Sequence, residues 1–526
     1  GATVVVNILW VKNICLPVAP LRRTGYLCRY SFCSLSPIWG AAFLLDRSQV
    51  DIPMSRKHPL FRCTALAVLT AYLLMPLELL ALTIGEERKI GEQLLYSIRK
   101  ELPILDDPDI SQYINTLGDR VLQTIGPQHY DYHFYVVKSK QFNAFAAPAG
   151  LVFFYSGLIE TMNNEDQLVS VLAHEIGHVV SRHIAQRMEK GTVIGAASLL
   201  LAIAGLAIGV PGLSPGLMMG SMAAGQAINL QYSREDEEQA DRLSFGWMQQ
   251  MHRNPKAMEE MLGIMRRVTR YSMGSETPQY LLTHPNPEAR LGYIQSMLEN
   301  AGAQAAPKQY VKTDNFDFYR FKYRVLSQAI DADKLRVYCT NLLASGTDPE
   351  QRIMANFGMS LLAAADRDYE NALKYLALVQ AKYPQRGILE IDRAAILTES
   401  GRFEEARSIL EKAVLRDPND QYGLYQLARI ESMRGNTSRA EQLLQRLSAS
   451  MPEYPQLYFE LGRIEANRGR EGMAGFYLSK YNLYLGKEKL AKQYLRRASK
   501  DTTIPEKYRS EARALLDKLK DLEKGI

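Results

Sequence analysis

The sequence contains few cysteines, five among 526 residues. Three lie in residues 1–53, which show little periodicity, and the fourth, Cys63, lies in an apolar run. Only Cys339 remains beyond that run, so the rest of the chain cannot form an intrachain disulfide. Residues 84–526 are nevertheless long enough to be held together by apolar cores, as a chain without disulfides must be.

An excess of charge of one sign is also missing. The chain has 63 Lys and Arg against 57 Asp and Glu, a net charge of +6, and no basic run dense enough for nucleic-acid binding. Hydrophobic residues make up 47% of the chain and charged residues 23%, a composition that excludes intrinsic disorder. We therefore predict a globular protein that does not bind nucleic acid.

A segment with the layout of a targeting signal begins at Met54. Basic residues come first, and an apolar run from Cys63 to Leu82 follows, interrupted only by Glu78. The basic residues are Arg56, Lys57 and Arg62. A basic start, an apolar stretch and small or neutral residues at its end are typical of a secretory signal peptide.

Residues 54–83 are therefore predicted to be a signal peptide that is cleaved near Ala81–Thr83. Residues 1–53 then form a non-native upstream extension, and the mature protein is secreted. A retained N-terminal anchor is the alternative interpretation of the same segment.

Residues 191–233 contain no charged residue. Their first half, Ile194–Val210, is apolar over 17 residues, short of the roughly 20 that a membrane-spanning helix needs. The sequence "PGLSPG" at Pro211–Gly216 then interrupts the pattern. We expect a helical hairpin, which either packs on the body of the protein or forms a surface for peripheral membrane contact or an apolar client.

The last third of the chain repeats with a step of 34 residues. Three residue types keep this step: Ala372, Ala406, Ala440 and Ala474; Gly401, Gly435 and Gly469; Pro384, Pro418 and Pro452. This is the period of the tetratricopeptide (TPR) helix–turn–helix unit, in which alanines let two helices approach, glycines end first helices and prolines separate units. We predict a TPR solenoid over residues 351–520, preceded at 306–350 by a linker that can include the first repeat helices.

Residues 84–305 combine helical patterns with one strand-rich region. Pro108–Leu122 has helical apolar spacing, and Asp131–Ser139 is rich in aromatic and β-branched residues, as strands are. Pro148 and Gly150 predict a turn or bulge between two further extended pieces. The predicted fold class is α+β and mainly helical, with a small β-sheet in this segment followed by the all-α repeats.

The motif "HEIGH" places His174 and His178 four residues apart. On an α-helix, four residues advance by about 400°, so both imidazoles project from one face about 6 Å apart and can hold one zinc ion. Glu175 would face the open side of the metal, where a carboxylate can take a proton from water and pass it to a leaving amine. The pattern predicts a zinc peptidase with one Zn²⁺ per chain.

A third protein ligand has to come from elsewhere in the chain. His183 would lie about 140° around a continuous helix from His178, so we expect it to be a surface or packing histidine. A later segment carries four consecutive acidic residues, Glu235 to Glu238, and then Asp241. Carboxylates also favour a solvated helix N-terminus, and the residues alone do not choose among the four.

The motif "HEIGH" followed by "SREDEEQAD" resembles the gluzincin metallopeptidases that include the CAAX prenyl proteases and the HtpX-like heat-shock proteases. The register of their second motif, E-x-x-A-D, implies that Glu237 is the third zinc ligand. It also implies that Asp241 orients a ligand histidine. The resemblance therefore predicts a zincin-type metalloprotease domain at residues 84–305.

Two further segments resemble the same family. "FNAFAAPAG" is similar to a family segment that usually has Gly at the position of Ala149, and it implies that Asn143, Ala144 and Phe145 line the cleft and bind substrate backbone. "THPNPEAR" implies that His284 and Arg290 stabilise the tetrahedral oxyanion. Alternatively, His284 occupies the open zinc position and holds the enzyme inactive.

The combination of signal peptide, peptidase and TPR tail resembles periplasmic quality-control proteases of Gram-negative bacteria. It implies an endopeptidase that degrades misfolded or stalled proteins during outer-membrane protein assembly. Its partners would be unfolded or outer-membrane protein substrates, and the β-barrel assembly machinery bound through the repeats. The alternative is a TPR chaperone or scaffold with a resting zinc site.

Overall fold

The computed structural model describes residues 82–189, 231–271, 279–302 and 310–524, which all belong to one compact unit, Glu78–Ile526. The predicted upstream extension, nearly all of the predicted signal peptide and most of the apolar segment 191–233 lie outside the described residues. Within those ranges, no helix combines the length and apolar character needed to cross a bilayer.

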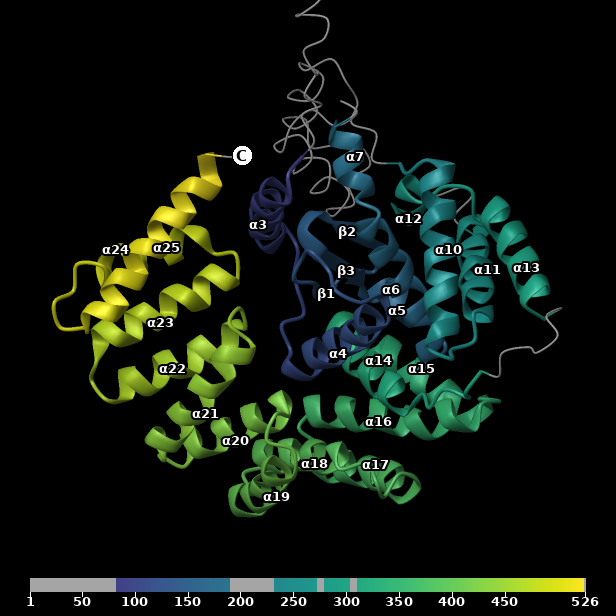
Figure 1. The fold of residues 1–526 in the computed structure, drawn as a ribbon. Coiled ribbons are helices and arrows are strands. Elements are labelled where there is room, and N and C mark those ends of the chain that lie inside the picture. Colours follow the sequence, from purple (N-terminus) through teal and green to yellow (C-terminus); the bar gives the residue numbers. More distant parts are fainter. Residues whose placement is uncertain (1–81, 190–230, 272–278, 303–309, 525–526) are drawn as a thin grey trace, which may run out of the picture. The chain divides into compact units, whose positions relative to one another are not determined.

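A small three-stranded sheet lies at the centre of the first half of the chain (Figure 1). Strand β3 (Leu151–Tyr155) is in the middle, paired in parallel with β1 (His133–Val137) and antiparallel with β2 (Ala144–Ala147). The predicted turn between the two extended pieces is the short 3₁₀ helix η1 (Pro148–Gly150). The predicted α+β, mainly helical fold class is confirmed.

Alternating side chains along the strands build a core on each face of the sheet. One face packs against α3 (Ile84–Glu101), whose buried Leu94 lies among residues such as Phe153. The other face packs against α4 (Pro108–Ile125) and α6 (Glu165–Val180). Because helices cover both faces of the sheet, the strands are apolar on both sides rather than alternately polar, except at the exposed His133 that begins β1.

The turn after β2 contains the residue at which the sequence departs from the family pattern. Ala149 has a φ of 66°, in the left-handed region that favours glycine. A Cβ atom on Gly91 of α3 would lie 2.6 Å from the Cβ of Ala149 and 2.9 Å from the carbonyl oxygen of Pro148. The glycine in α3 therefore makes room for the side chain that this turn carries.

Further helices complete the first half of the chain. They are α5 (Ser156–Thr161), α7 (His183–Glu189), α10 (Arg234–Gln250), α11 (Lys256–Tyr271), α12 (Gln279–Thr283) and α13 (Pro287–Gly302). Helix α6 begins after Asn164, whose side chain accepts a hydrogen bond from the backbone N–H of Gln167. Helix α10 packs along α6 (Figure 1).

The second half of the chain is helical. Its helices are α14 (Phe316–Ala329), α15 (Ala332–Ser345), α16 (Pro349–Ala365), α17 (Tyr369–Lys382), α18 (Ile388–Glu399), α19 (Phe403–Arg416), α20 (Gln421–Met433), α21 (Thr437–Ser450), α22 (Pro455–Asn467), α23 (Glu471–Tyr484), α24 (Glu488–Ala498) and α25 (Glu506–Lys524). The repeated glycines follow α18, α20 and α22, with φ values of 81°, 82° and 71°. The repeated alanines are buried in the helices that come next. The period found in the sequence is thus the period of the helix pairs.

Helix α14 joins the two halves through buried charges. Arg320 contacts Asp109 of α4 at 2.6 Å and Asp392 of α18 at 2.7 Å. Arg324 contacts the same two carboxylates, each at 2.6 Å. All four side chains are largely buried, and loss of one partner from such a group leaves a buried charge uncompensated, at about 3–5 kcal/mol.

The left-handed position after the first helix of each repeat also occurs one step earlier, at Arg367, with a φ of 63°. A left-handed L-residue costs about 1–2 kcal/mol, more than the extra chain entropy of glycine, about 0.5–1 kcal/mol. We expect Arg367→Gly to stabilise the array by roughly 0.5–1 kcal/mol, measured as a higher midpoint of thermal unfolding by circular dichroism. Gly401→Ala, at the matching place one repeat later, should lower that midpoint. A lower midpoint for Arg367→Gly would contradict this account.

Candidate metal centre

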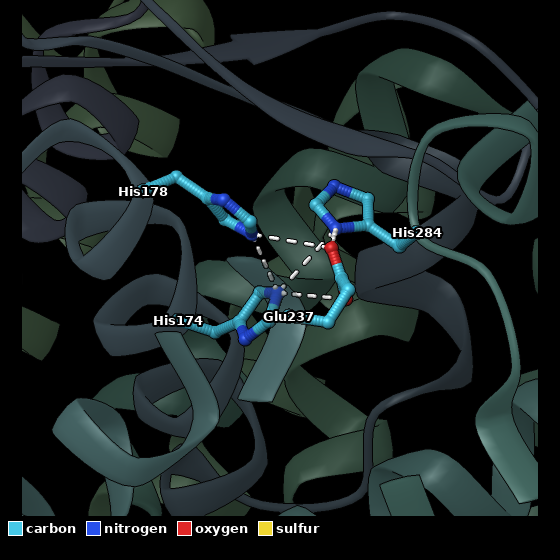
Figure 2. A group of neighbouring side chains, drawn as sticks. All are labelled: His174, His178, Glu237 and His284. Atoms are coloured by element: carbon cyan, nitrogen blue, oxygen red, sulfur yellow. Dashed lines mark hydrogen bonds and ion pairs between the residues drawn. The ribbon is translucent and has the colours of Figure 1, made fainter. Parts of the chain in front are cut away.

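Four side chains from three parts of the chain converge beside the sheet (Figure 2). His174 and His178 come from α6, Glu237 from the first turn of α10, and His284 from the link between α12 and α13. Their candidate donor atoms all lie within 4.8 Å of one another, and each residue is no more than 2% exposed. Among the described residues, this is the only such group of potential metal ligands.

Close contact between α6 and α10 brings these donors together. A Cβ atom on Gly177 would lie 3.1 Å from the Cα and 3.2 Å from the carbonyl oxygen of Ala240. No side chain therefore separates the helices at this point. His178 directly follows Gly177, and Glu237 lies one turn before Ala240 on the facing helix.

The acidic run at the start of α10 divides into different roles. Ser233 and Asp236 form a capping box, in which each side chain accepts a hydrogen bond from the other's backbone N–H. Glu238 pairs with Arg242 on the exposed side of the helix. Of the four consecutive carboxylates, only that of Glu237 joins the cluster.

His174 is held by a carboxylate on the side away from the other donors. Its Nδ1 lies 2.8 Å from Oδ1 of Asp241. Burial acts to lower the pKa of His174, but Asp241 and Glu237 raise it above its ordinary value. Its Nε2 points into the cluster, 3.1 Å from Nε2 of His178. Asp241 thus lies where it can orient His174, as the resemblance predicted for a ligand histidine.

His178 has a different environment. Burial holds its pKa well below the ordinary value, which keeps the imidazole neutral with a free lone pair. The ring of Tyr232 stacks on it, with ring centres 3.8 Å apart. A neutral imidazole is the form that binds a metal ion.

Arg290 lies behind the donors and balances their negative charge. It donates from Nε and Nη2 to the two carboxylate oxygens of Asp241, each at 2.8 Å, and its Nη1 lies 2.6 Å from Oε2 of Glu237. Burial acts to raise the pKa of both carboxyls, but Arg290 helps hold each below its ordinary value. The guanidinium is thus directed at carboxylates, and its predicted contact with an oxyanion stays a prediction.

His284 fills the side of the cluster that faces Glu175. Its Nδ1 lies 2.9 Å from Oε1 of Glu237, and its Nε2 lies 3.5 Å from Oε1 of Glu175. The ring of Tyr280 stacks on it, and the Tyr280 hydroxyl lies 3.5 Å from the same oxygen of Glu175. The ring thus lies beside Glu237 and Glu175, and both predicted roles of His284 stay predictions.

The residues present fit a zinc ion. Two imidazole nitrogens and one carboxylate oxygen are a catalytic zinc ligand set, and the candidate donor atoms of His174, His178 and Glu237 lie within 4.8 Å of one another. Oε2 of Glu175 is buried and has no hydrogen-bond partner among the described residues. A buried carboxylate oxygen without a partner is costly, which is consistent with a group kept for chemistry.

The three predicted substrate-binding residues lie at the start of the edge strand β2. The backbone oxygen of Asn143 accepts a hydrogen bond from the N–H of Tyr155, and Ala144 pairs with Phe154 of β3. The ring of Phe145 packs into the core beneath the sheet, so this residue can offer a substrate only its backbone. A small cavity lies between the end of β2 and His178.

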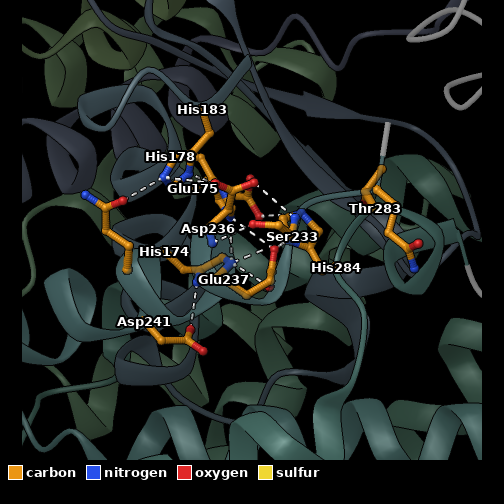
Figure 3. Close-up of polar contacts among 12 residues, drawn as sticks. His174, Glu175, His178, His183, Ser233, Asp236, Glu237, Asp241, Thr283 and His284 are labelled. Atoms are coloured by element: carbon orange, nitrogen blue, oxygen red, sulfur yellow. Dashed lines mark hydrogen bonds and ion pairs between the residues drawn. The ribbon is translucent and has the colours of Figure 1, made fainter. Parts of the chain in front are cut away.

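The sequence did not indicate that the rings of Tyr232, Tyr280 and His183 lie beside the donors. His183 is 1% exposed, so of the two predicted alternatives the packing histidine is confirmed and the surface histidine is wrong. Its approach to His178 does not follow from a continuous helix, because α6 ends at Val180 and Arg182 adopts a left-handed conformation with a φ of 53°. His183 therefore turns back towards His178 (Figure 3). No spacing rule along one helix could have indicated this.

Comparison with known proteins gives matches to both halves of the chain. Residues 108–298 match peptidase family M48, and residues 363–430 and 397–461 match the tetratricopeptide repeat. The beta-barrel assembly-enhancing protease of Yersinia pestis is 30% identical over 398 residues, covering 74% of this chain and 79% of that protein. The protein of the same description from Escherichia coli (strain K12) is 29% identical over 396 residues, covering 68% and 78%. Metalloprotease LoiP of Escherichia coli (strain K12) is 28% identical over 154 residues, covering 29% and 58%.

The contact at Gly177 leads to a test of how the donors are assembled. A branched side chain in Gly177→Val would push α6 away from α10 and separate the two histidines from Glu237. We expect this variant to lose bound metal, measured by elemental analysis, while circular dichroism shows that most helical structure remains.

Gly246→Ala on α10 is the matched control, because no heavy atom lies within 4 Å of the added Cβ. It should keep its metal and gain about 0.5–1 kcal/mol of stability. Wild-type metal affinity in Gly177→Val would refute the importance of the close approach.

Proposed function

Because the chain belongs to the family of beta-barrel assembly-enhancing proteases, with an M48 peptidase domain and C-terminal TPR repeats, we propose that it is a zinc-dependent endopeptidase of outer-membrane protein quality control. The observation that carries this proposal is the convergence of His174, His178 and Glu237 beside Glu175. The proposed domains are a signal peptide at 54–83, the peptidase at 84–305 and the repeats at 351–520.

Each residue of the site would have its own role in peptide hydrolysis. His174, His178 and Glu237 would hold one Zn²⁺, which supplies Lewis acidity that polarises a scissile carbonyl and acidifies water. Glu175 would take a proton from the attacking water and deliver it to the leaving amine nitrogen. Asp241 and Arg290 would keep His174 and Glu237 in place from behind.

His284 supports the proposal of a resting state. It lies among the donors at hydrogen-bond distance from Glu237 and close to Glu175, where water and a substrate carbonyl would have to enter. In this state His284 is a fourth ligand that keeps substrate out. A shift of the link between α12 and α13 would release the site, after which His284 and Arg290 could approach an oxyanion.

Substrates are proposed to be unfolded or stalled outer-membrane proteins in the periplasm. We propose that an extended chain adds to the outer edge of β2 at Asn143, Ala144 and Phe145. The repeats would bind the client or the assembly machinery on their concave surface. Residues 191–233 are proposed to add peripheral contact with a membrane or an apolar client.

Replacement of Glu175 by Gln tests the peptidase activity. We expect Glu175→Gln to bind zinc like the wild type and to lose cleavage of a casein-like substrate by about 100-fold or more, because the proton acceptor is gone. Undiminished turnover by a pure preparation would reject Glu175 as the base. If Glu175→Gln fully rescues a deletion strain, the scaffold alternative with a resting site is favoured instead.

Metal content per chain tests the ligand set. Glu237→Gln should lose zinc, because it removes the only carboxylate in the cluster that contacts both histidines. His284→Ala should keep zinc and cleave faster, because three ligands remain and the entry side is open. Glu238→Gln is the matched control on the exposed side of α10 and should behave like wild type. Retention of zinc by Glu237→Gln would reject the third ligand.

A further inference from the structure

The rings of His178 and His183 are in contact at the C-terminal end of α6 (Figure 3). The contact joins the two Nδ1 atoms at 2.9 Å. The other nitrogen of His178, Nε2, points to the metal donors and lies 3.1 Å from Nε2 of His174. His183 therefore contacts His178 on the side that a bound metal would not use.

Hydrogen-bond chemistry fixes where the protons lie along this contact. If Nε2 of His178 donates its lone pair to a metal, the ring hydrogen lies on Nδ1 and must be donated to an acceptor. Nδ1 of His183 is that acceptor, so the hydrogen of His183 lies on Nε2. This second hydrogen has its own acceptor, Oε1 of Gln239 at 3.1 Å, whereas the nearest oxygen of Asp236 is 3.8 Å away. Donors and acceptors match at each step.

The fold holds His183 in this place by pinning the turn before it. Arg182, in its left-handed conformation, donates from Nε to Oε1 of Glu87 at 2.7 Å. The hydroxyl of Tyr130 donates to the other oxygen of Glu87 at 2.6 Å. Glu87 belongs to α3, which lies across the sheet from α6, and it is 3% exposed. The direction of His183 is thus set by a buried polar group and not by helix α7 alone.

We propose that His183 is a positioning residue for the metal, which holds His178 in the tautomer and orientation that present Nε2 to the ion. The inference rests on the proposed zinc site and deepens it. Because Gln239 lies two residues after Glu237, the chain from His178 through His183 also links the helices that carry the histidine and carboxylate ligands. Loss of this partner should weaken metal binding without removing any ligand.

Three substitutions at His183 separate the effect of losing its hydrogen-bond acceptor, Nδ1, from the effect of losing its ring volume. In His183→Asn, the amide oxygen is bonded to Cγ, as Nδ1 is in histidine, so the acceptor for His178 is kept. In His183→Gln, the amide lies one atom further out, near the place of Nε2, and that acceptor is lost. His183→Phe keeps the ring volume and removes both nitrogens. His129→Phe, at an exposed histidine, is the control for a general loss of imidazole.

The measurement is the zinc dissociation constant of the full chain, obtained by competition with a chelator. We expect His183→Phe and His183→Gln to weaken zinc binding by about 10- to 100-fold, and His183→Asn and His129→Phe to stay close to wild type. The d–d absorption spectrum of the Co²⁺ forms should change for Phe and Gln but not for Asn, because the geometry at His178 changes with its partner. Thermal unfolding of the metal-free proteins shows whether each variant is folded.

The outcomes separate the inference from the proposed function. If the wild type binds no metal, the zinc site itself is refuted. If the wild type binds zinc and all three His183 variants do so equally, the inference fails and His183 is only a packing residue. An equal loss of zinc affinity in His183→Asn, His183→Gln and His183→Phe also overturns the inference, because the cause would then be the changed volume of the side chain and not the missing hydrogen-bond acceptor. If Phe does not fold, the comparison of Asn with Gln decides alone.

Discussion

Helices α6 and α10 meet where Gly177 faces the backbone of Ala240, and the arrangement of His174, His178 and Glu237 depends on that contact. The histidines lie beside Gly177 on one helix, and Glu237 and Asp241 lie beside Ala240 on the other. The small residues of the two motifs, Gly177 and Ala240, thus allow the close approach of the helices on which the ligand positions depend. A wider separation would leave two half-sites, neither with enough ligands to hold a metal ion.

Charge balance is the second constraint on the centre. Two carboxylates, Glu237 and Asp241, are buried among imidazoles, and their ionised forms would be too costly there without the guanidinium of Arg290. Arg290 supplies this charge from behind, so the inward faces of the donors stay directed at one another. The ion pairs of Arg290 with Glu237 and Asp241 therefore stabilise the fold and also hold the metal-binding side chains in place.

The sequence was sufficient for features that follow from local periodicity, and insufficient for those that depend on where an element ends. Spacing alone was enough to pair His174 with His178, and a 34-residue step was enough to predict the repeats. Glu237 could be chosen among four consecutive carboxylates only through a family resemblance, because capping explains acidic residues at a helix start equally well. The contact of His183 with His178 could not be predicted, because Arg182, in the turn after α6, is bound by Glu87, which is distant in the sequence.

The ion pairs of α14 have a consequence for the order in which the protein acquires its structure. Asp109 precedes Arg320 and Arg324 in the chain, but Asp392 follows Arg320 by 72 residues. The residues of the peptidase domain and of α14 are therefore all made before the carboxylate of α18 that pairs with both arginines. The buried charges of α14 are balanced on both sides only when this part of the repeats is present.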